Sequence, residues 1–297
     1  MSVTEATTKT ILITGADGQV GREFRRLLET EKSYKVFFTN RQQLAIDDVA
    51  SVDSFFQENN INHCINCAAY TAVDRAEAEP DLAFRINGTA VGYLAEACKN
   101  HCADFYHLST DYVYSGKSTK PYKEDDPVDP TNVYGASKLL GEELALAKNP
   151  ETTIIRTSWV YSEYGNNFVK TMVKLMNEKD SINVVDDQKG SPTYAADIAK
   201  MIWTMITSVK ENKGVFNYAN NGAVTWFQFA LAIKDLISSN CIVNPTTSDQ
   251  FKTTATRPSF SVMNTKKIQS ILPEPIPTWN ASLQSCLHRF GLVSAHK

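Results

Sequence analysis

A tyrosine and a lysine four residues apart form the clearest candidate pair for acid–base chemistry. Tyr134 and Lys138 stand in the stretch NVYGASKLLGEE at the expected start of a helix, so both side chains project from one face. A phenol has an unperturbed pKa of about 10, but a neighbouring ammonium lowers that pKa toward neutrality. The pair could then donate a proton to a carbonyl oxygen as a hydride arrives. Because this spacing is common on surface helices, the interpretation depends on companion residues.

Two such companions stand where an apolar run ends, in LSTDYVYSG at 108–116. Thr110 lies at the expected carboxyl end of a strand, the edge at which open α/β sheets bind ligands. Its hydroxyl could hydrogen-bond both a substrate carbonyl and the oxygen of Tyr134. Asp111 follows directly, and we expect it to orient a ligand beside Thr110. The alternative is a carboxylate that only caps the local backbone.

A glycine triplet near the N-terminus predicts a dinucleotide-binding loop. Gly15, Gly18 and Gly21 occur in ILITGADGQVGREF, directly after an expected strand and at the start of an expected helix. They would permit a tight turn, backbone approach to a pyrophosphate and close packing of helix on sheet. The helix N-terminus would add unpaired N–H groups and a positive dipole end. A glycine-rich surface turn is the simpler alternative.

The end of the second expected strand bears on the choice of nicotinamide cofactor. Sites for NAD usually place an acidic residue there, on the ribose 2′-hydroxyl. This chain has Asn40 and Arg41 instead. A guanidinium could pair with a 2′-phosphate, which favours NADPH over NADH. Arg41 could also stack on adenine or stay in solvent.

The elements that must position these residues alternate along the first half of the chain. Strands are expected at 10–15, 35–40, 63–69, 104–110 and 152–161, with helices at 19–30, 49–59, across 80–100 and at 134–148. Strands separated by helices must cross over into a parallel sheet, so the fold class is α/β, a Rossmann-type doubly wound sheet. Residues 1–160, with about 193–222 added, would form the nucleotide-binding domain. After Tyr161 the pattern becomes irregular, and 161–192 with 223–297 would form a smaller substrate-binding region.

Composition sets the limits of function. The chain has 297 residues and a net charge of −3, with no basic stretch that suggests nucleic acid. It has no apolar stretch long enough to span a bilayer, and the polar first ten residues are unlike a secretory leader. Cys64 and Cys67 fall within one expected strand, so their side chains should point to opposite faces rather than share a metal or a disulfide. We expect a cytoplasmic, reducing location.

Several stretches together resemble the extended short-chain dehydrogenase/reductases, and within them the family of dTDP-4-dehydrorhamnose reductases. The likeness covers nearly the whole chain, and its motifs are GADGQVG, INCAAYTAVDRAEAEP, STDYVY, NVYGASKLLGE, RTSWVY, GNNFVKTM, DDQKGSPT and RPSFSVMNT. The resemblance implies reduction of the 4-keto group of dTDP-4-dehydro-L-rhamnose by NADPH or NADH to give dTDP-L-rhamnose. This would be the last step in making that sugar donor for cell-surface polysaccharide.

The resemblance also implies roles for individual residues. Thr110, Tyr134 and Lys138 would be catalytic. Besides Tyr134 and Lys138, the cofactor would contact Gly15, Asp17, Gly18, Gln19, Val20, Asn40, Arg41, Asp47, Ala68, Ala69, Tyr70 and Asn87, the last as a structural asparagine. The nucleotide-sugar would contact Thr110, Asp111, Tyr134, Trp159, Lys189, Gly190 and Arg257.

The chain departs from the family pattern in ways that matter for specificity. Ala45 stands where an aspartate is frequent, and Asp47 or Asp48 could serve instead; Phe260 replaces a frequent asparagine. Related dehydratases carry an Asp-Glu pair after the threonine, whereas here Tyr112 follows Asp111. A tyrosine cannot replace that carboxylate at neutral pH, so Asp111 is not expected to be half of an elimination pair.

Other functions remain open on the sequence alone. A different deoxysugar reductase or a sugar-nucleotide epimerase would share most of these residues. A non-enzymatic regulatory subunit, similar to the methionine adenosyltransferase beta subunit, would share the fold and glycine loop but lacks segments of the RTSWVY and DQKGSPT type. The chain could be a monomer or a homodimer. Magnesium occurs at a dimer contact in some family members, but the sequence shows no carboxylate cluster for it, and no metal ligand is assigned.

Overall fold

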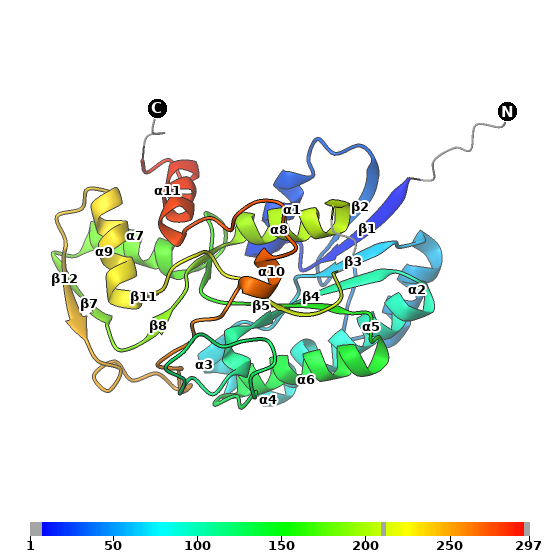
Figure 1. Cartoon of the computed structure of the whole chain (residues 1–297), viewed down its shortest axis with the longest axis horizontal. Helices are drawn as coiled ribbons and strands as arrows, with labels where there is room; N and C mark the ends of the chain where they lie inside the picture. Colours follow the sequence, from blue (N-terminus) through cyan, green and yellow to red (C-terminus); the bar gives the residue numbers. More distant parts are fainter. Residues whose placement is uncertain (1–7, 209–211, 294–297) are drawn as a thin grey trace.

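A parallel β-sheet forms the centre of the molecule (Figure 1). The computed structural model describes residues 8–208 and 212–293. Within them, six strands pair in the order β10-β5-β4-β3-β1-β2, each pair parallel. This confirms the predicted doubly wound α/β class. The strands are β1 (Lys9–Thr14), β2 (Tyr34–Thr39), β3 (His63–Asn66), β4 (Asp104–Thr110), β5 (Thr153–Thr157) and β10 (Gly214–Asn217).

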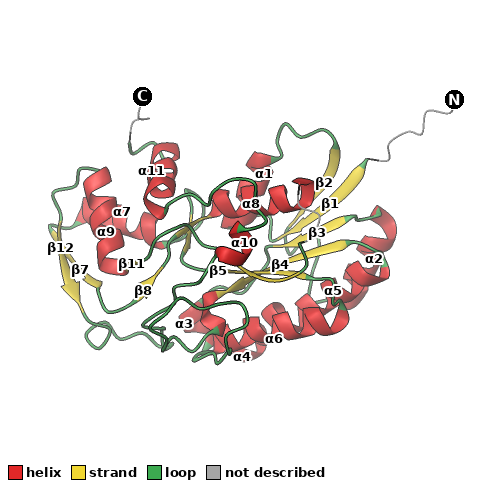
Figure 2. Cartoon of the chain, viewed as in Figure 1, coloured by secondary structure: helices red, strands yellow, loops and turns green. Residues whose placement is uncertain are grey.

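Helices cover both faces of this sheet (Figure 2). On one face lie α1 (Gln19–Leu27) and α8 (Ala195–Ser208), and on the other α2 (Val49–Asn59), α5 (Ala90–Asn100) and α6 (Val133–Lys148). Successive side chains of a strand alternate between the two faces of the sheet. Ile11 and Ile13 therefore belong to the apolar core under α1 and α8, and Leu12 belongs to the core on the opposite face, under α2 and α5. Cys64 and Cys67 separate in the same way, as predicted.

A second packed unit lies beyond the carboxyl ends of the central strands, at the left of Figure 1. Its helices α7, α9 and α11 enclose an apolar core that includes Tyr161, Val169, Phe229 and Leu283. The chain enters this unit after β5, returns to the central sheet as β10, and enters it again. The remaining elements are α3 (Val73–Ala76), α4 (Pro80–Phe84), η1 (Arg85–Thr89), η2 (Asp111–Val113), β6 (Val160–Tyr161), α7 (Phe168–Glu178), β7 (Ser181–Val185), β8 (Lys189–Gly190), β9 (Thr193–Tyr194), β11 (Val224–Thr225), α9 (Trp226–Leu236), β12 (Ile242–Thr246), α10 (Lys266–Gln269) and α11 (Trp279–Arg289).

Two expectations about regularity need correction. The strand expected over 152–161 is broken, because Trp159 has a φ of 47° that a β-strand cannot accommodate. The region after Tyr161 is also more regular than its prolines suggested. Pro245 lies inside β12, which pairs with β7 in a two-stranded sheet and so has a free edge for a residue without an N–H.

Among the described residues, no helix is both long and apolar enough to cross a membrane. Residues 1–7, which carry most of the polar N-terminal stretch, lie outside the described part of the chain.

Candidate active site

The glycine loop forms the turn between β1 and α1, as predicted. Gly15 has a φ of +64°, and a Cβ there would lie 2.5 Å from the backbone N of Ala68. At Gly21 a Cβ would lie 2.5 Å from the carbonyl O of Gly15. Side chains are therefore excluded where β1, α1 and the end of β3 meet. The first N–H groups of α1 have no partner within the helix, and Gly15, Asp17 and Gly18 of the turn line a cleft beside it.

This cleft, of about 470 Å³, is within the size range of ligand sites. The Asn40 amide donates to Asp17 Oδ2 at 2.9 Å and closes one rim, next to the exposed Arg41. Most residues assigned to the cofactor do line it: Gly15, Asp17, Gly18, Asn40, Arg41, Asp47, Ala68, Ala69 and Tyr70. Sequence reasoning missed its apolar floor of Leu44, Ile46, Leu82 and Ile86.

Two further cofactor assignments, Val20 and Asn87, have different surroundings. Val20 is buried in the core under α1 and α8. Asn87 is fully buried and binds both backbone groups of Tyr70, accepting from its N at 2.8 Å and donating to its O at 3.0 Å. Asn87 thus holds the backbone of a residue that lines the cleft, and its role as a structural asparagine stays a prediction. Of the two acids offered in place of Ala45, Asp47 lines the cleft, whereas Asp48 accepts a hydrogen bond from Ala50 N and caps α2.

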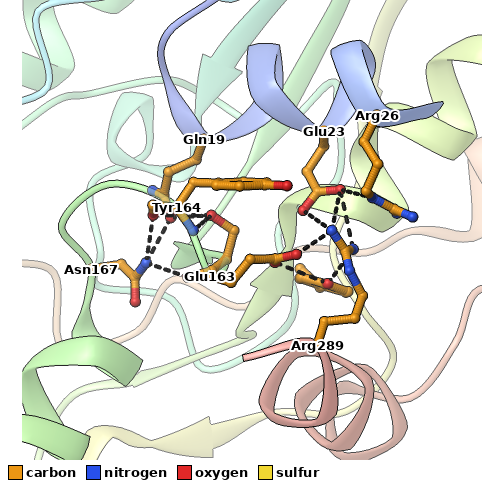
Figure 3. Close-up of polar contacts among 9 residues, drawn as sticks. Gln19, Glu23, Arg26, Glu163, Tyr164, Asn167 and Arg289 are labelled. Carbon is orange, nitrogen blue, oxygen red and sulfur yellow. Dashed lines mark hydrogen bonds and ion pairs between the residues drawn. The ribbon is translucent and has the colours of Figure 1, made fainter. Parts of the chain in front are cut away.

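The Gln19 side chain points away from the loop, toward the second unit (Figure 3). Its Oε1 accepts hydrogen bonds from Ser162 Oγ at 3.0 Å and from Asn167 Nδ2 at 2.8 Å. One turn further along α1, the fully buried Glu23 accepts from Arg289 on α11, and Arg289 also pairs with Glu163. The helix that follows the glycine loop is thus joined by polar contacts to the unit beyond the sheet.

Thr110 and Tyr134 lie together at the carboxyl end of β4, as predicted. Thr110 is the last residue of β4, and Tyr134 is in the first turn of α6, where Asn132 caps the helix by accepting from Gly135 N. Burial raises the pKa of Tyr134, and a hydrogen bond with Thr110 acts against that rise. Burial, rather than the ammonium of Lys138, therefore decides the direction in the protein alone, contrary to the expected lowering.

Lys138 lies on the same face of α6 but turns its amine toward β4. Its Nζ donates to Leu108 O at 2.6 Å and lies 3.3 Å from His107 Nε2. The side chain is buried, and burial lowers the pKa of Lys138 to about 8. No role was assigned to His107 from the sequence, because a histidine inside an apolar strand is usually a core residue.

Asp111 is buried beside Thr110, with one oxygen engaged and one free. Its Oδ1 accepts from Thr110 Oγ1 at 3.0 Å, and its Oδ2 has no hydrogen-bond partner among the described residues. Burial raises the pKa of Asp111 to about 7. The Ser261 hydroxyl lies near this carboxylate and is likewise without a hydrogen-bond partner among the described residues. The ligand-orienting role of Asp111 stays a prediction, and the unpartnered buried oxygen is compatible with it.

The predicted substrate residue Trp159 is held by an aromatic stack. Its ring lies 3.4 Å from that of Trp226 with an interplanar angle of 5°. A Cβ at Gly190 would lie 2.4 Å from the Trp159 ring, so a glycine is required there. Gly190 thus supports Trp159 through its lack of a side chain, while the neighbouring Lys189 is exposed. Trp226 was missed, because nothing in its local sequence distinguishes it from a core tryptophan.

Arg257 borders a second, largely apolar cavity, which lies in the unit beyond the sheet. The cavity is lined by Phe168, Met172, Asn183, Val184, Val185, Gln188, Trp226, Phe251, Thr253 and Arg257. Arg257 Nη2 pairs with Asp74 Oδ2 at 2.8 Å, and Nη1 lies 3.4 Å from the hydroxyl of Tyr112. Tyr112 in turn packs edge-on against Tyr134, with ring centroids 5.7 Å apart. Contacts through Tyr112 therefore link Arg257 to Tyr134.

The described residues contain no group of three or more His, Cys, Asp or Glu side chains arranged to hold a metal ion.

A parallel doubly wound sheet, with a glycine loop after its first strand and a threonine, tyrosine and lysine at its carboxyl edge, defines a short-chain dehydrogenase/reductase of the extended type. The sequence pattern of the family described as the RmlD substrate binding domain matches residues 9–292. The chain belongs to this family.

Relatives with stated activities agree with that membership. A dTDP-4-dehydrorhamnose reductase of Aggregatibacter actinomycetemcomitans is 38% identical over 285 residues, 93% of this chain and 97% of that protein. A dTDP-4-keto-6-deoxy-D-glucose reductase of Streptomyces niveus is 34% identical over 286 residues, 96% of this chain and 97% of that protein. The crystal structure of dTDP-4-dehydrorhamnose reductase from Bacillus anthracis in complex with NADP has a TM-score of 0.91 and 36% identity, covering 95% of this chain and 99% of that one.

Proposed function

We propose that this protein reduces the 4-keto group of dTDP-4-dehydro-L-rhamnose with NADPH and releases dTDP-L-rhamnose. One observation carries the proposal: Thr110 and Tyr134 lie at the carboxyl end of β4, in the same parallel sheet as the strand that precedes the glycine loop, and Tyr112 links Tyr134 to Arg257 at the second cavity. A nicotinamide cofactor in the glycine-loop cleft and a nucleotide-sugar in the second cavity would meet at the catalytic tyrosine. The relative in Aggregatibacter, which shares 38% of its residues with this chain, carries this activity in its name.

Tyr134, Thr110 and Lys138 would each have a separate role in the reduction. A bound nicotinamide would supply the hydride. Tyr134 holds the proton that the new alkoxide oxygen must receive, and its raised pKa keeps the phenol protonated before transfer. The Thr110 hydroxyl, at the end of β4, would bond both the substrate oxygen and the tyrosine, exchanging the hydrogen bond that it donates to Asp111. Lys138 would bind the ribose and provide positive charge as the phenolate forms.

The same site is poorly suited to elimination of water. A dehydratase needs a second carboxylate after the aspartate, to act as a base separate from the acid. Here that position is Tyr112, and burial raises the pKa of Tyr112 to about 12. It stays neutral at physiological pH and cannot take a proton from carbon. The residue instead contacts Arg257, which supports a role in shaping the substrate side of the site.

The preference for NADPH rests on the rim of the cofactor cleft. Arg41 is exposed at that rim, and the neighbouring Asn40 amide is bonded to Asp17. An acid at the end of β2 would repel a 2′-phosphate, whereas a free guanidinium can pair with it. Asp47, which lines the same cleft, is already paired with Arg85 at 3.2 Å, and Asp17 accepts the hydrogen bond of Asn40.

Oxidation of NADPH, followed at its absorbance band, tests the proposal with two substrates in parallel: dTDP-4-dehydro-L-rhamnose and dTDP-4-keto-6-deoxy-D-glucose. We expect the first to be turned over with the higher kcat/KM. A preference for the second would assign the activity named for the relative in Streptomyces niveus.

The alternatives outside reduction have their own signatures. A sugar-nucleotide epimerase keeps its cofactor through the cycle, so stoichiometric NAD in the purified protein would favour it. A regulatory subunit would oxidise NADPH with neither sugar. Either result would contradict the proposal.

A further inference from the structure

A buried polar chain runs behind Lys138, away from the face where substrates would bind. His107 Nε2 lies 3.3 Å from Lys138 Nζ, and His107 Nδ1 lies 3.1 Å from Asn66 Nδ2. Asn66 Oδ1 is 2.6 Å from the hydroxyl of Thr14, the residue before the glycine loop, and 3.1 Å from Ala68 N. His107 and Asn66 are each fully buried. Bulk water therefore cannot satisfy the hydrogen bonds of these groups. Each donor in the chain must face an acceptor within the protein.

The backbone N–H of Ala68 fixes those roles. It can only donate, so the Asn66 atom that it meets must be the carbonyl oxygen Oδ1, and the amide cannot be flipped. The amide nitrogen Nδ2 is then the atom that faces His107. It donates, and His107 Nδ1 must accept. A neutral imidazole with an acceptor at Nδ1 carries its proton on Nε2, and an imidazolium, with donors at both nitrogens, is excluded.

The Nε2–H of His107 therefore faces the amine of Lys138. An ammonium has three donors and no acceptor, so it cannot bond this group favourably. A neutral amine has a lone pair that can accept from it. The histidine thus favours the neutral form of Lys138 over the charged form, beyond what burial alone would do.

We propose that His107 is a positioning residue that acts through Lys138, holding the lysine ready to give up its proton near physiological pH. This rests on the proposed function, since the proton concerned is the one that Tyr134 must regain after each reduction. A lysine that releases its proton readily can restore the phenol, directly or through a bridging hydroxyl, and take a new proton from solvent before the next turnover.

The other groups around Lys138 do not reproduce this effect. On α6, Glu142 would favour the ammonium, but it is itself paired with Arg156 at 2.6 Å and accepts from Ser109. On the far side of β3, burial raises the pKa of the Cys67 thiol, which keeps it neutral. The pKa of His107 is lowered well below its ordinary value by burial and by Lys138, in agreement with a neutral ring.

The tautomer of His107 can be measured without any substrate. Two-bond ¹H–¹⁵N spectra of the ¹⁵N-histidine-labelled protein distinguish Nε2–H, Nδ1–H and imidazolium forms. The chain has five histidines, and a His107→Gln sample assigns the signal. We expect a single Nε2–H form from pH 5 to pH 9 (roughly the range in which an ordinary histidine titrates fully). An Nδ1–H signal or a titrating ring would overturn the proposal, whatever reaction the enzyme catalyses.

The effect on Lys138 is tested with two variants of opposite chemistry. Asn66→Asp keeps the acceptor for Ala68 but makes His107 donate from Nδ1, so that Nε2 can accept from an ammonium. His107→Phe removes the donor and adds no charge. In both variants the ammonium form of Lys138 is no longer disfavoured, so the pKa of Lys138 should rise. The alkaline decline of reductase activity should then move to higher pH by about one unit, which corresponds to the free energy of about one buried hydrogen bond to a charged group.

The pH profiles of His107→Phe and Asn66→Asp either support or overturn the role of His107. A profile unchanged in His107→Phe would mean that the histidine only fills space. If that variant does not fold, Asn66→Asp replaces it, with its tautomer checked by the same spectra; a shift without a change of tautomer would be an effect of charge alone and would overturn the proposal.

Discussion

Gln19 Oε1 accepts a hydrogen bond from Asn167 Nδ2 at 2.8 Å, although 148 positions separate the two residues along the chain (Figure 3). Gln19 begins the helix after the glycine loop, and Asn167 caps α7 by accepting from Lys170 N. The contact therefore joins the element expected to hold the cofactor to the unit expected to hold the sugar nucleotide. Hydride transfer needs both reactants at a fixed separation, so such a joint contributes to alignment.

Replacing Gln19 tests whether its side chain serves the joint or the cofactor. We expect Gln19→Ala to reduce the free energy of unfolding by about 1–3 kcal/mol and to lower kcat, because the side chain loses its hydrogen bonds with Ser162, Asn167 and the carbonyl O of Val160. NADPH binding, measured by calorimetry, should change little, since the side chain points away from the cleft. Gln19→Glu, which keeps the acceptor, is the matched control. Much weaker NADPH binding with unchanged stability would instead assign the side chain to the pyrophosphate.

Tyr134→Phe should remove the proton donor and keep the ring. We predict a fall in kcat of about 10²–10⁴, the usual contribution of a positioned acid. The edge-on contact with Tyr112 involves only the ring, so the local packing should survive. Cofactor affinity, read by fluorescence titration with NADPH, should stay close to that of the parent. A variant with near-normal turnover would show that another group supplies the proton.

The protonation of Asp111 should leave a trace in the pH dependence of stability. Burial raises its pKa to about 7, so from about pH 4 to pH 7 the folded protein holds a proton that the unfolded chain has released. This contribution is complete below the unfolded value and is lost as pH rises through 7. Asp111→Asn removes it. Denaturant unfolding at pH 5 and pH 8 should show the parent losing more stability than the variant, by up to a few kcal/mol at about 1.4 kcal/mol per unit. Parallel losses would mean that Asp111 is ionised throughout.

The first half of the fold could be predicted from the sequence because its signals are local. The strand 104–110 was predicted with the bounds that β4 has, since an apolar run there ends abruptly in Ser109, Thr110 and Asp111. Glycine spacing likewise fixed the turn before α1. These features depend on residues close together in the chain, and the catalytic residues come from the same elements.

The rest depends on contacts that no local pattern reveals. The interruption of the strand at Trp159 is stabilised by stacking on Trp226, which lies 67 residues later in the sequence. It also depends on Gly190, whose missing side chain leaves room for the Trp159 ring. His107 reads as a core residue until Asn66 and Lys138 are placed on either side of it. Such pairings arise from the topology of the sheet, where neighbours in space come from distant strands.

Arg41 should discriminate between the two nicotinamide cofactors. Only NADPH carries the 2′-phosphate, so Arg41→Ala is predicted to raise the KM for NADPH more than the KM for NADH. A charge-assisted contact of about 1.5–3 kcal/mol corresponds to more than tenfold. Arg22, exposed on α1, offers a matched control that removes a nearby charge. Equal changes with both cofactors would place the Arg41 guanidinium in solvent.

Arg257 is predicted to bind the pyrophosphate of the nucleotide-sugar, and its ion pair with Asp74 provides the control. The guanidinium borders the apolar cavity and reaches Tyr112, so a phosphate there would lie between the sugar at Tyr134 and a base in the cavity. The pair with Asp74 spans 2.8 Å and is part-exposed, which makes it worth less than about 1 kcal/mol by itself.

Both Arg257→Ala and Asp74→Ala break that pair, and Asp74→Ala also removes the acceptor of Ala255 N, so the loss of stability should be the larger in Asp74→Ala. Binding should differ. Removing Arg257 takes away the cation and should weaken dTDP binding severalfold or more, whereas removing Asp74 frees the guanidinium and should leave binding equal or tighter. Some loss of kcat in Arg257→Ala is also expected, because remote binding energy helps to orient the reacting carbon. Calorimetry with dTDP decides the question, and NADPH affinity should be unchanged in both. If the two variants bind dTDP equally well, Arg257 serves only the surface ion pair, and the pyrophosphate must be held elsewhere.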